Sequence, residues 1–356
     1  MVVDCHVHVF PPMGGPSGFR STADHMRFVQ WLMFHRSEGR RLDDNSVVTG
    51  ADWHEDDDPD ELQFRGGTYG RFLWTARGID YSRQYLPVSM SNLESTPEMI
   101  AAHMDYVGVD KAVIQTGHTY GRLNRFISDA VRTDPDRFWG LAMVDEWRID
   151  QPDQVRELET AIRELGLHGL FFNTGNLGRQ GRKETVDDPI FDPFWDRVRQ
   201  LGIPVFWNIT SDLRGNEGYF AGHAAFGRWL KRRPDIPSVY THGLPLYRFM
   251  DSSGSIVISE DVWEPLEAPN VLTEVLMPIL QGHLWEYPFE EGQAIIRQYY
   301  ERLGPDHLIW GSDLPNVERF CTYKQSLDYL RLHCDFISKA DMDKICGGNT
   351  ARLLQG

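Results

Sequence analysis

The feature that most constrains the fold is a regular alternation of short β-rich runs and amphipathic helical segments from about residue 95 onward. Such alternation is typical of repeated βα units, in which helices cover a parallel sheet. Together with the first residues, these runs predict a distorted (β/α)8 TIM barrel with catalytic groups at the carboxyl ends of its strands. The predicted strands are Val2–Phe10, Lys111–Thr116, Trp139–Val144, Gly169–Phe172, Ile203–Asn208, Ser238–His242, Val271–Leu276 and Leu308–Gly311. The predicted helices include Pro97–Val107, Pro152–Leu165, Phe191–Leu201, Phe226–Arg233 and Glu291–Leu303.

Residues 11–94 interrupt this alternation, because they separate the first strand from its helix. Long loops inside a compact domain are usually functional, so we predict an insertion within a single domain of residues 1–356. The insertion holds a predicted short helix, Ala23–His35, together with aromatic residues and arginines at Trp31, Trp53, Phe72, Trp74, Tyr81, Tyr85, Arg71, Arg77 and Arg83. Among these we expect Trp74, Arg77 and Arg83 to bind substrate. The same composition is typical of subunit interfaces, so a lid and a homodimer contact are both compatible with it.

The charge balance argues against a nucleic-acid partner. The chain has 36 Lys and Arg against 52 Asp and Glu, a net charge of −16, whereas nucleic-acid binding needs a basic face. No apolar stretch approaches the roughly 18 residues of a membrane span, and no secretory signal is evident. Cys5, Cys321, Cys334 and Cys346 form no CxxC pair, and we expect them to be reduced. These features favour a cytoplasmic enzyme that acts on a small molecule.

The first predicted strand carries the motif Asp4-Cys5-His6-Val7-His8. Because strand residues alternate between faces, we expect Asp4, His6 and His8 on one face and Cys5 on the other. Two adjacent imidazoles would leave polar atoms unpaired in a dry core. The spacing therefore indicates a metal site, with His6 and His8 as ligands and a neighbouring carboxylate that fixes ring orientation.

Two later strands also end in residues of metal-binding types. Thr241-His242-Gly243 closes the sixth predicted strand, and Gly311-Ser312-Asp313 closes the eighth. Each alone has a simpler explanation, because a histidine before glycine can belong to a turn and Gly-Ser-Asp can cap a helix. Together with the opening motif and in barrel order, they predict His242 and Asp313 at one catalytic rim with His6 and His8.

At these residues the chain resembles the amidohydrolase superfamily, in particular the branch that contains aminocarboxymuconate-semialdehyde decarboxylase and related metal-dependent hydrolases. The resemblance covers nearly the whole chain outside the insertion. It rests on Asp4–His8, Thr96–Gln115, Ile203–Phe206, Thr241–Gly243, Gly311–Pro315 and Gly348–Leu354. It implies a divalent metal held by His6, His8 and Asp313, with His242 as a catalytic or additional metal-binding histidine.

The sequence departs from these relatives at two strand ends. Relatives usually end the fifth strand with a histidine ligand, where this chain has Asn208, and Asn173 stands where a carbamylated lysine would close the fourth strand. We expect both asparagines to contact substrate. Glu274 lies within the seventh strand, and a buried carboxylate there is costly unless it binds a metal, a cation or a donor, so we predict a further metal ligand. His118 follows the second strand and either binds substrate or caps the turn.

Three reactions are compatible with these residues. The first is hydrolysis of a small cyclic or aromatic carboxylate-bearing compound, in which Asp313 takes a proton from water and His242 polarises the substrate. The second is non-oxidative decarboxylation of an aromatic acid by the same groups. The third is a nonheme diiron monooxygenase on the same barrel, because mixed histidine and carboxylate donors suit iron as well as manganese or zinc. One or two divalent ions are accordingly expected.

Overall fold

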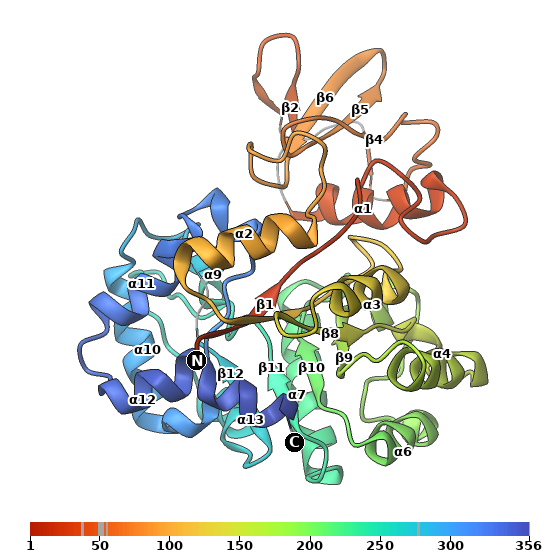
Figure 1. Ribbon diagram of the computed structural model, residues 1–356. Coiled ribbons are helices and arrows are strands. Elements are labelled where there is room, and N and C mark those ends of the chain that lie inside the picture. Colours follow the sequence, from red (N-terminus) through yellow and green to blue (C-terminus); the bar gives the residue numbers. More distant parts are fainter. Residues whose placement is uncertain (37–38, 49–52, 55, 276–277, 356) are drawn as a thin grey trace.

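The computed structural model describes residues 1–36, 39–48, 53–54, 56–275 and 278–355. Eight parallel strands follow one another in chain order and form the inner wall of a barrel (Figure 1). They are β1 (Val3–Val7), β7 (Lys111–Ile114), β8 (Phe138–Ala142), β9 (Gly169–Asn173), β10 (Val205–Asn208), β11 (Ser238–Tyr240), β12 (Val271–Glu274) and β13 (Leu308–Ile309). The first and last strand regions meet where the Cys5 N–H donates to the Trp310 carbonyl over 3.1 Å. The predicted TIM barrel is confirmed.

Helices surround the barrel (Figure 1). The longer ones are α2 (Pro97–Val107), α3 (Asn124–Thr133), α4 (Pro152–Arg163), α6 (Asp192–Leu201), α7 (Asn216–Arg232), α10 (Glu290–Leu303) and α11 (Tyr323–His333), and the chain ends with α12 (Lys339–Asp343) and α13 (Asn349–Gln355). Helix α2 has the predicted bounds because Thr96 caps its first turn, Pro97 opens it and Gly108 ends it in a left-handed conformation. In the part of the chain that the structure describes, no helix is long and apolar enough to cross a membrane.

Helix α7 begins well before the predicted Phe226, at Asn216. Its first turns contain Gly218 and Gly222, and glycine lowers helix propensity, which is why the sequence pattern misses them. The tertiary structure supplies the reason for glycine: a Cβ at Gly218 would lie 2.0 Å from Asp212 Oδ1. The helix therefore packs directly on the loop that follows β10.

The insertion forms a small lobe at one end of the barrel (Figure 1). It contains α1 (Thr22–Arg36) and an antiparallel sheet of β3 (Val47–Val48), β2 (Gly39–Arg41), β6 (Ile79–Gln84), β5 (Arg71–Ala76) and β4 (Arg65–Gly66), in that order. The sheet is absent from the sequence-based prediction, which recognised only the helix. Helix α1 lies between this sheet and the barrel, where Phe28 stacks on His118 with ring centroids 5.3 Å apart.

Alternate strand residues fill the barrel interior, among them Val3, Cys5, Val113, Leu141, Phe171, Phe206, Val239 and Ile309. Because side chains on a strand have a period of two, residues two positions later form the next layer toward the carboxyl ends. That layer contains Gln115, Asn173, Asn208, Glu274 and Gly311. The apolar interior thus gives way to polar side chains at the catalytic end of the barrel.

Strand β1 does not keep the expected alternation. Its pairing with β7 is irregular between Asp4 and Val7, and a bulge of this kind changes which face a side chain occupies. The Cys5 sulfur points into the barrel, 3.2 Å from Glu274 Oε1, while the Asp4 carboxylate contacts Ser312 and Tyr323. The prediction that Asp4 shares a face with the histidines and Cys5 lies opposite is wrong for this reason.

The Asp4 carboxylate ties the first strand to the loop after the last one. Oδ1 accepts the backbone N–H groups of His6 (3.0 Å) and Ser312 (2.9 Å), and Oδ2 accepts the hydroxyls of Ser312 (2.5 Å) and Tyr323 (3.0 Å). Burial raises the pKa of Asp4 to about 6 and these donors limit the rise. The group is therefore ionised at neutral pH with donors on both oxygens.

The loss of stability on substitution of Asp4 should depend on how many hydrogen-bond donors are left without an acceptor. Asp4→Ala should lower the free energy of unfolding by about 2–5 kcal/mol, because two backbone N–H groups lose their acceptor in the interior. Asp4→Asn should cost less than half as much, because the hydroxyls of Ser312 and Tyr323 can accept from an amide. Urea unfolding measures both, and the exposed helical Asp129→Ala should change stability by no more than about 0.5 kcal/mol. Equal losses for Asn and Ala would contradict this account.

Candidate metal centre and active site

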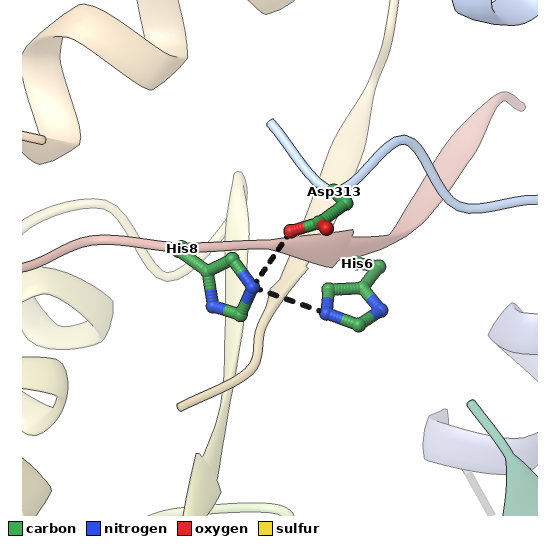
Figure 2. Close-up of side chains that lie close together, drawn as sticks. All are labelled: His6, His8 and Asp313. Atoms are coloured by element: carbon green, nitrogen blue, oxygen red, sulfur yellow. Dashed lines mark hydrogen bonds and ion pairs between the residues drawn. The ribbon is translucent and has the colours of Figure 1, made fainter. Parts of the chain in front are cut away.

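Three ligand-type side chains converge at the carboxyl end of the barrel (Figure 2). His6 Nε2 lies 3.2 Å from His8 Nε2, which lies 2.8 Å from Asp313 Oδ1. One ligand atom from each residue lies within 4.8 Å of the others, and all three residues are buried. The three residues predicted to bind the metal therefore lie close together in space, although His6 and His8 are near the start of the chain and Asp313 is near its end.

The tautomers of both histidines are set by their other ring nitrogens. His6 Nδ1 lies 3.1 Å from Glu274 Oε2, and His8 Nδ1 lies 3.0 Å from the Gln115 carbonyl oxygen. Carboxylate and carbonyl oxygens only accept hydrogen bonds, so both Nδ1 atoms carry the proton. The Nε2 atoms of both rings face each other and the Asp313 carboxylate, so a proton or a metal ion must lie among these three groups. In this structure the 2.8 Å contact between His8 Nε2 and Asp313 Oδ1 is that of a protonated ring nitrogen, and a divalent metal would take the place of that proton.

Asp313 belongs to the loop that follows β13. Its backbone has a left-handed φ of 61°, and its N–H donates to the His6 carbonyl over 2.9 Å. The Asn316 amide donates to Asp313 Oδ1 over 2.8 Å, while none of the described residues donates to Oδ2. Burial alone would raise the pKa of Asp313, but the hydrogen bond and charge of His8 outweigh it and lower this pKa. One oxygen is thus engaged and the other is left for a proton.

Glu274 lies behind the histidine pair, on the far ring nitrogen of His6. Its Oε1 accepts a hydrogen bond from Gln115 Nε2 over 2.9 Å, and its Oε2 accepts the His242 backbone N–H. Burial would raise the pKa of Glu274, but the charge of His6 lowers it overall. This geometry makes Glu274 an orienting partner of a ligand, outside the three-donor cluster.

Gly311 is required by the close approach of β1 to the last strand. A Cβ at Gly311 would lie 2.8 Å from His6 Cβ and 3.0 Å from the Cys5 sulfur. Contacts below about 3 Å cannot form without displacing one partner, so any larger residue would push His6 out of place. The Gly-Ser-Asp sequence accordingly combines a packing requirement with a ligand.

His242 follows β11 with a left-handed φ of 66°. Its ring centroid lies 4.7 Å from that of His6, and its Nδ1 lies 3.2 Å from Thr241 Oγ1. Burial and the positive charge of His6 lower the pKa of His242 to about 4. The ring is therefore neutral at neutral pH, beside the three-donor cluster.

The predicted substrate residues of the barrel differ in whether their side chains already make hydrogen bonds within the protein. Asn173 Oδ1 accepts the Thr210 hydroxyl over 2.6 Å, whereas the Asn208 side chain has no hydrogen bond to any described residue. His118 Nε2 is hydrogen-bonded to Asp145 Oδ1 over 3.1 Å, while its Nδ1 lies 3.3 Å from Glu146 Oε2 without a hydrogen bond. Of these three side chains, that of Asn208 is therefore the one available to bind substrate.

Two of the three predicted substrate residues of the insertion contact other parts of the insertion. Trp74 is 1% exposed and packs inside the small sheet, with its ring 5.0 Å from Phe34. Arg83 donates to the Met33 carbonyl, and Arg77 lies exposed in the turn between β5 and β6. Trp74 and Arg83 thus make contacts within the insertion, and composition alone could not separate such contacts from substrate binding.

Two contact residues at the cluster are absent from the predicted set. The Tyr120 ring lies 4.5 Å from that of His8, and its hydroxyl accepts from the Asn316 amide over 2.7 Å. Tyr120 also shares a side-chain hydrogen bond with Tyr85 of the insertion. Asn316 stands three residues after Asp313 and Tyr120 two after His118, so proximity to the motifs is the only sequence signal.

The fold and the three-donor cluster define a metal-dependent barrel enzyme. A family model described as amidohydrolase matches residues 3–356. The chain belongs to this amidohydrolase family.

Relatives in the family carry out more than one reaction. The chain is 28% identical over 112 residues to γ-resorcylate decarboxylase of Polaromonas sp., which covers 31% of this chain and 33% of that protein, so the match spans about a third of the relative. A probable 2-pyrone-4,6-dicarboxylic acid hydrolase from Acinetobacter baumannii has a TM-score of 0.59 at 16% identity and covers 100% of this chain and 99% of that one. A dihydroxybenzoic acid decarboxylase from Polaromonas sp. with bound manganese has a TM-score of 0.55 at 18% identity, covering 74% and 87%. The similarity to these two structures shows a shared fold.

The metal content of the protein should depend on His6 and His8. Protein purified without chelators should hold about one divalent ion per chain, and His6→Ala and His8→Ala should each lose it. His54→Ala, which changes an exposed histidine of the insertion, should keep the wild-type content. Elemental analysis measures this, and full metal content in His8→Ala would contradict the assigned ligands.

Glu274→Gln should weaken metal binding while leaving the ligands in place. A side-chain amide holds the His6 Nδ1 proton less well than a carboxylate, and loss of such an orienting partner typically costs about 10–100-fold in metal affinity. Titration of metal-free protein with manganese measures the change, with the exposed Glu291→Gln as control. Unchanged affinity in Glu274→Gln would show that the carboxylate does not set the ligand geometry.

Proposed function

We propose that the protein is a metal-dependent hydrolase of a small cyclic or aromatic carboxylate-bearing compound. The observation that carries the proposal is the asymmetry of Asp313, whose Oδ1 contacts His8 and Asn316 while Oδ2 accepts no hydrogen bond from the described residues. The lowered pKa keeps the Asp313 carboxylate ionised at neutral pH, and the oxygen without a donor is the atom that can accept a proton from water.

His6, His8 and Asp313 would hold the metal. When bound, the ion lowers the pKa of a water molecule and polarises the substrate carbonyl. Asp313 Oδ2 takes the proton from the attacking water as the carbon–oxygen bond forms. The neutral His242 ring stabilises the negative charge that develops on the carbonyl oxygen, and Asp313 then returns the proton to the leaving oxygen.

Asn208 supports recognition of a polar substrate group at the rim. Its amide, unengaged by the described residues, lies in the polar layer beside Asn173, with which it is paired across β9 and β10. An amide offers both a donor and an acceptor, so it can hold a carboxylate or a hydroxyl of the substrate. Helix α1 crosses the mouth of the barrel at His118 and Trp147, which favours a lid over a homodimer contact as the role of the insertion.

Decarboxylation of an aromatic acid is the second candidate. The similarity to γ-resorcylate decarboxylase over 112 residues favours it, and the same side chains could serve, with the proton delivered to a ring carbon. The diiron alternative has less support, because the described residues provide a single three-donor group. Two iron ions would need a second set of ligands.

Product analysis separates the two leading reactions. Manganese-loaded protein is offered 2-pyrone-4,6-dicarboxylate, 2,6-dihydroxybenzoate and 5-carboxyvanillate, and we expect ring opening of the pyrone with one oxygen taken from labelled water and no carbon dioxide. Carbon dioxide release from either aromatic acid, with the ring intact, would replace the hydrolase by the decarboxylase. Turnover that requires dioxygen and a reductant would overturn both.

His242→Asn should separate catalysis from metal binding. Loss of a positioned histidine should lower kcat by about 10²–10⁴-fold, while the metal content stays at the wild-type value because His242 lies outside the three-donor cluster. Steady-state kinetics and elemental analysis on the same preparation measure this. A proportional loss of metal would instead identify His242 as a ligand.

A further inference from the structure

A cavity lies between the insertion and the loop after β13. Its volume is about 540 Å³, within the range of small-molecule pockets. Leu86 and Pro87 line it from the insertion, Arg319 and Phe320 line it from the metal-ligand loop, and His283 lies between them. None of these residues belongs to the three-donor cluster.

Arg319 lines this cavity without a counter-ion. Its Nε donates to the Asn316 carbonyl over 3.2 Å, and its guanidinium lies 5.2 Å from the Phe320 ring centroid. The adjacent Glu318 faces His103 over 3.7 Å. Within the part of the chain that the structure describes, no carboxylate pairs with Arg319, and its two Nη groups donate no hydrogen bond. A half-buried arginine in a chain of net charge −16 is thus left without an acid partner.

The local charge and the flanking rings define what could bind. The His283 ring lies 4.5 Å from that of Phe320, and burial together with the positive charge of Arg319 lowers the pKa of His283. The cavity therefore combines the Arg319 cation with aromatic and apolar side chains, and the carboxylate that also lines it, Glu318, faces His103. A guanidinium fork binds a carboxylate through two parallel hydrogen bonds, and aromatic walls favour a planar ring.

Two chains of contacts connect the cavity with the metal centre. Arg319 bonds the Asn316 carbonyl, and the Asn316 amide bonds Asp313. On the insertion side, the Arg319 guanidinium lies 5.8 Å from the Tyr85 ring centroid, and Tyr85 shares a hydrogen bond with Tyr120, which packs on His8. Occupancy at Arg319 is therefore placed to affect both Asp313 and the insertion.

We propose that this cavity is a carboxylate subsite in which Arg319 binds an acidic group of an aromatic or ring-containing substrate, remote from the bond that reacts. The inference rests on the proposed function, because it assigns the subsite to the substrate of the same metal centre. It also gives the insertion a role in specificity, since Leu86 and Pro87 form one wall.

The test uses isophthalate and its neutral analogue isophthalamide as probes, with binding measured by calorimetry on manganese-loaded and metal-stripped full-length protein. Wild type should prefer isophthalate, and Arg319→Gln should weaken isophthalate binding by about tenfold or more without changing isophthalamide. Arg319→Lys should fall between them, because lysine keeps the charge but not the fork. Arg297→Gln is the matched control, since Arg297 also stacks on an aromatic ring, Phe336 at 4.1 Å, but lies outside the cavity.

The outcomes separate this inference from the proposed function. Arg319-dependent isophthalate binding that persists in metal-stripped protein supports the subsite, even if no compound is turned over. Equal affinities in wild type and Arg319→Gln, or an equal loss in Arg297→Gln, would overturn the subsite while leaving the hydrolase intact. Tighter binding of inorganic phosphate than of isophthalate at Arg319 would overturn the assignment to an aromatic carboxylate.

Discussion

The hydrogen bond between His6 Nδ1 and Glu274 is the interaction on which the rest of the site depends. It holds a proton on Nδ1 and orients the ring, so that Nε2 faces His8 and Asp313. Gln115 does the same for His8 through its backbone carbonyl. The polar layer of the barrel therefore sets the ring orientation of both histidines. Their Nε2 atoms point toward each other because the partners of the Nδ1 atoms, Glu274 and Gln115, lie on or next to other strands.

The two buried carboxylates on either side of β1 have different tasks. Asp4 holds the strand to the loop that carries Ser312, while Glu274 holds the His6 ring. Both are supported by several donors, and this is the condition under which a buried charge is tolerated. Removal of either would disturb the same ligand set, Asp4 through the backbone and Glu274 through ring orientation.

The insertion contacts the barrel close to the candidate metal centre. Its sheet is a separate small core around Trp74, but α1 contacts the barrel mouth and Tyr85 bonds Tyr120 beside His8. The family fold supplies the metal centre, whereas this segment supplies walls of its own, including one side of the Arg319 cavity. Differences in substrate among relatives are expected to lie in such segments, because barrel loops vary while strand ends keep their ligands.

The barrel and the cluster of His6, His8 and Asp313 could be predicted from the sequence, because strand periodicity and strand-end polarity are local patterns that recur along the eight strands. It could not determine the face of Asp4, since the bulge in β1 arises from pairing with β7. It also could not separate Trp74, which packs in a core, from Tyr85, which reaches the site, because both are aromatic residues of one segment. The ring orientation of His6, and the lack of an acid partner for Arg319 among the described residues, became visible only in the folded structure, because both depend on residues that are distant in sequence.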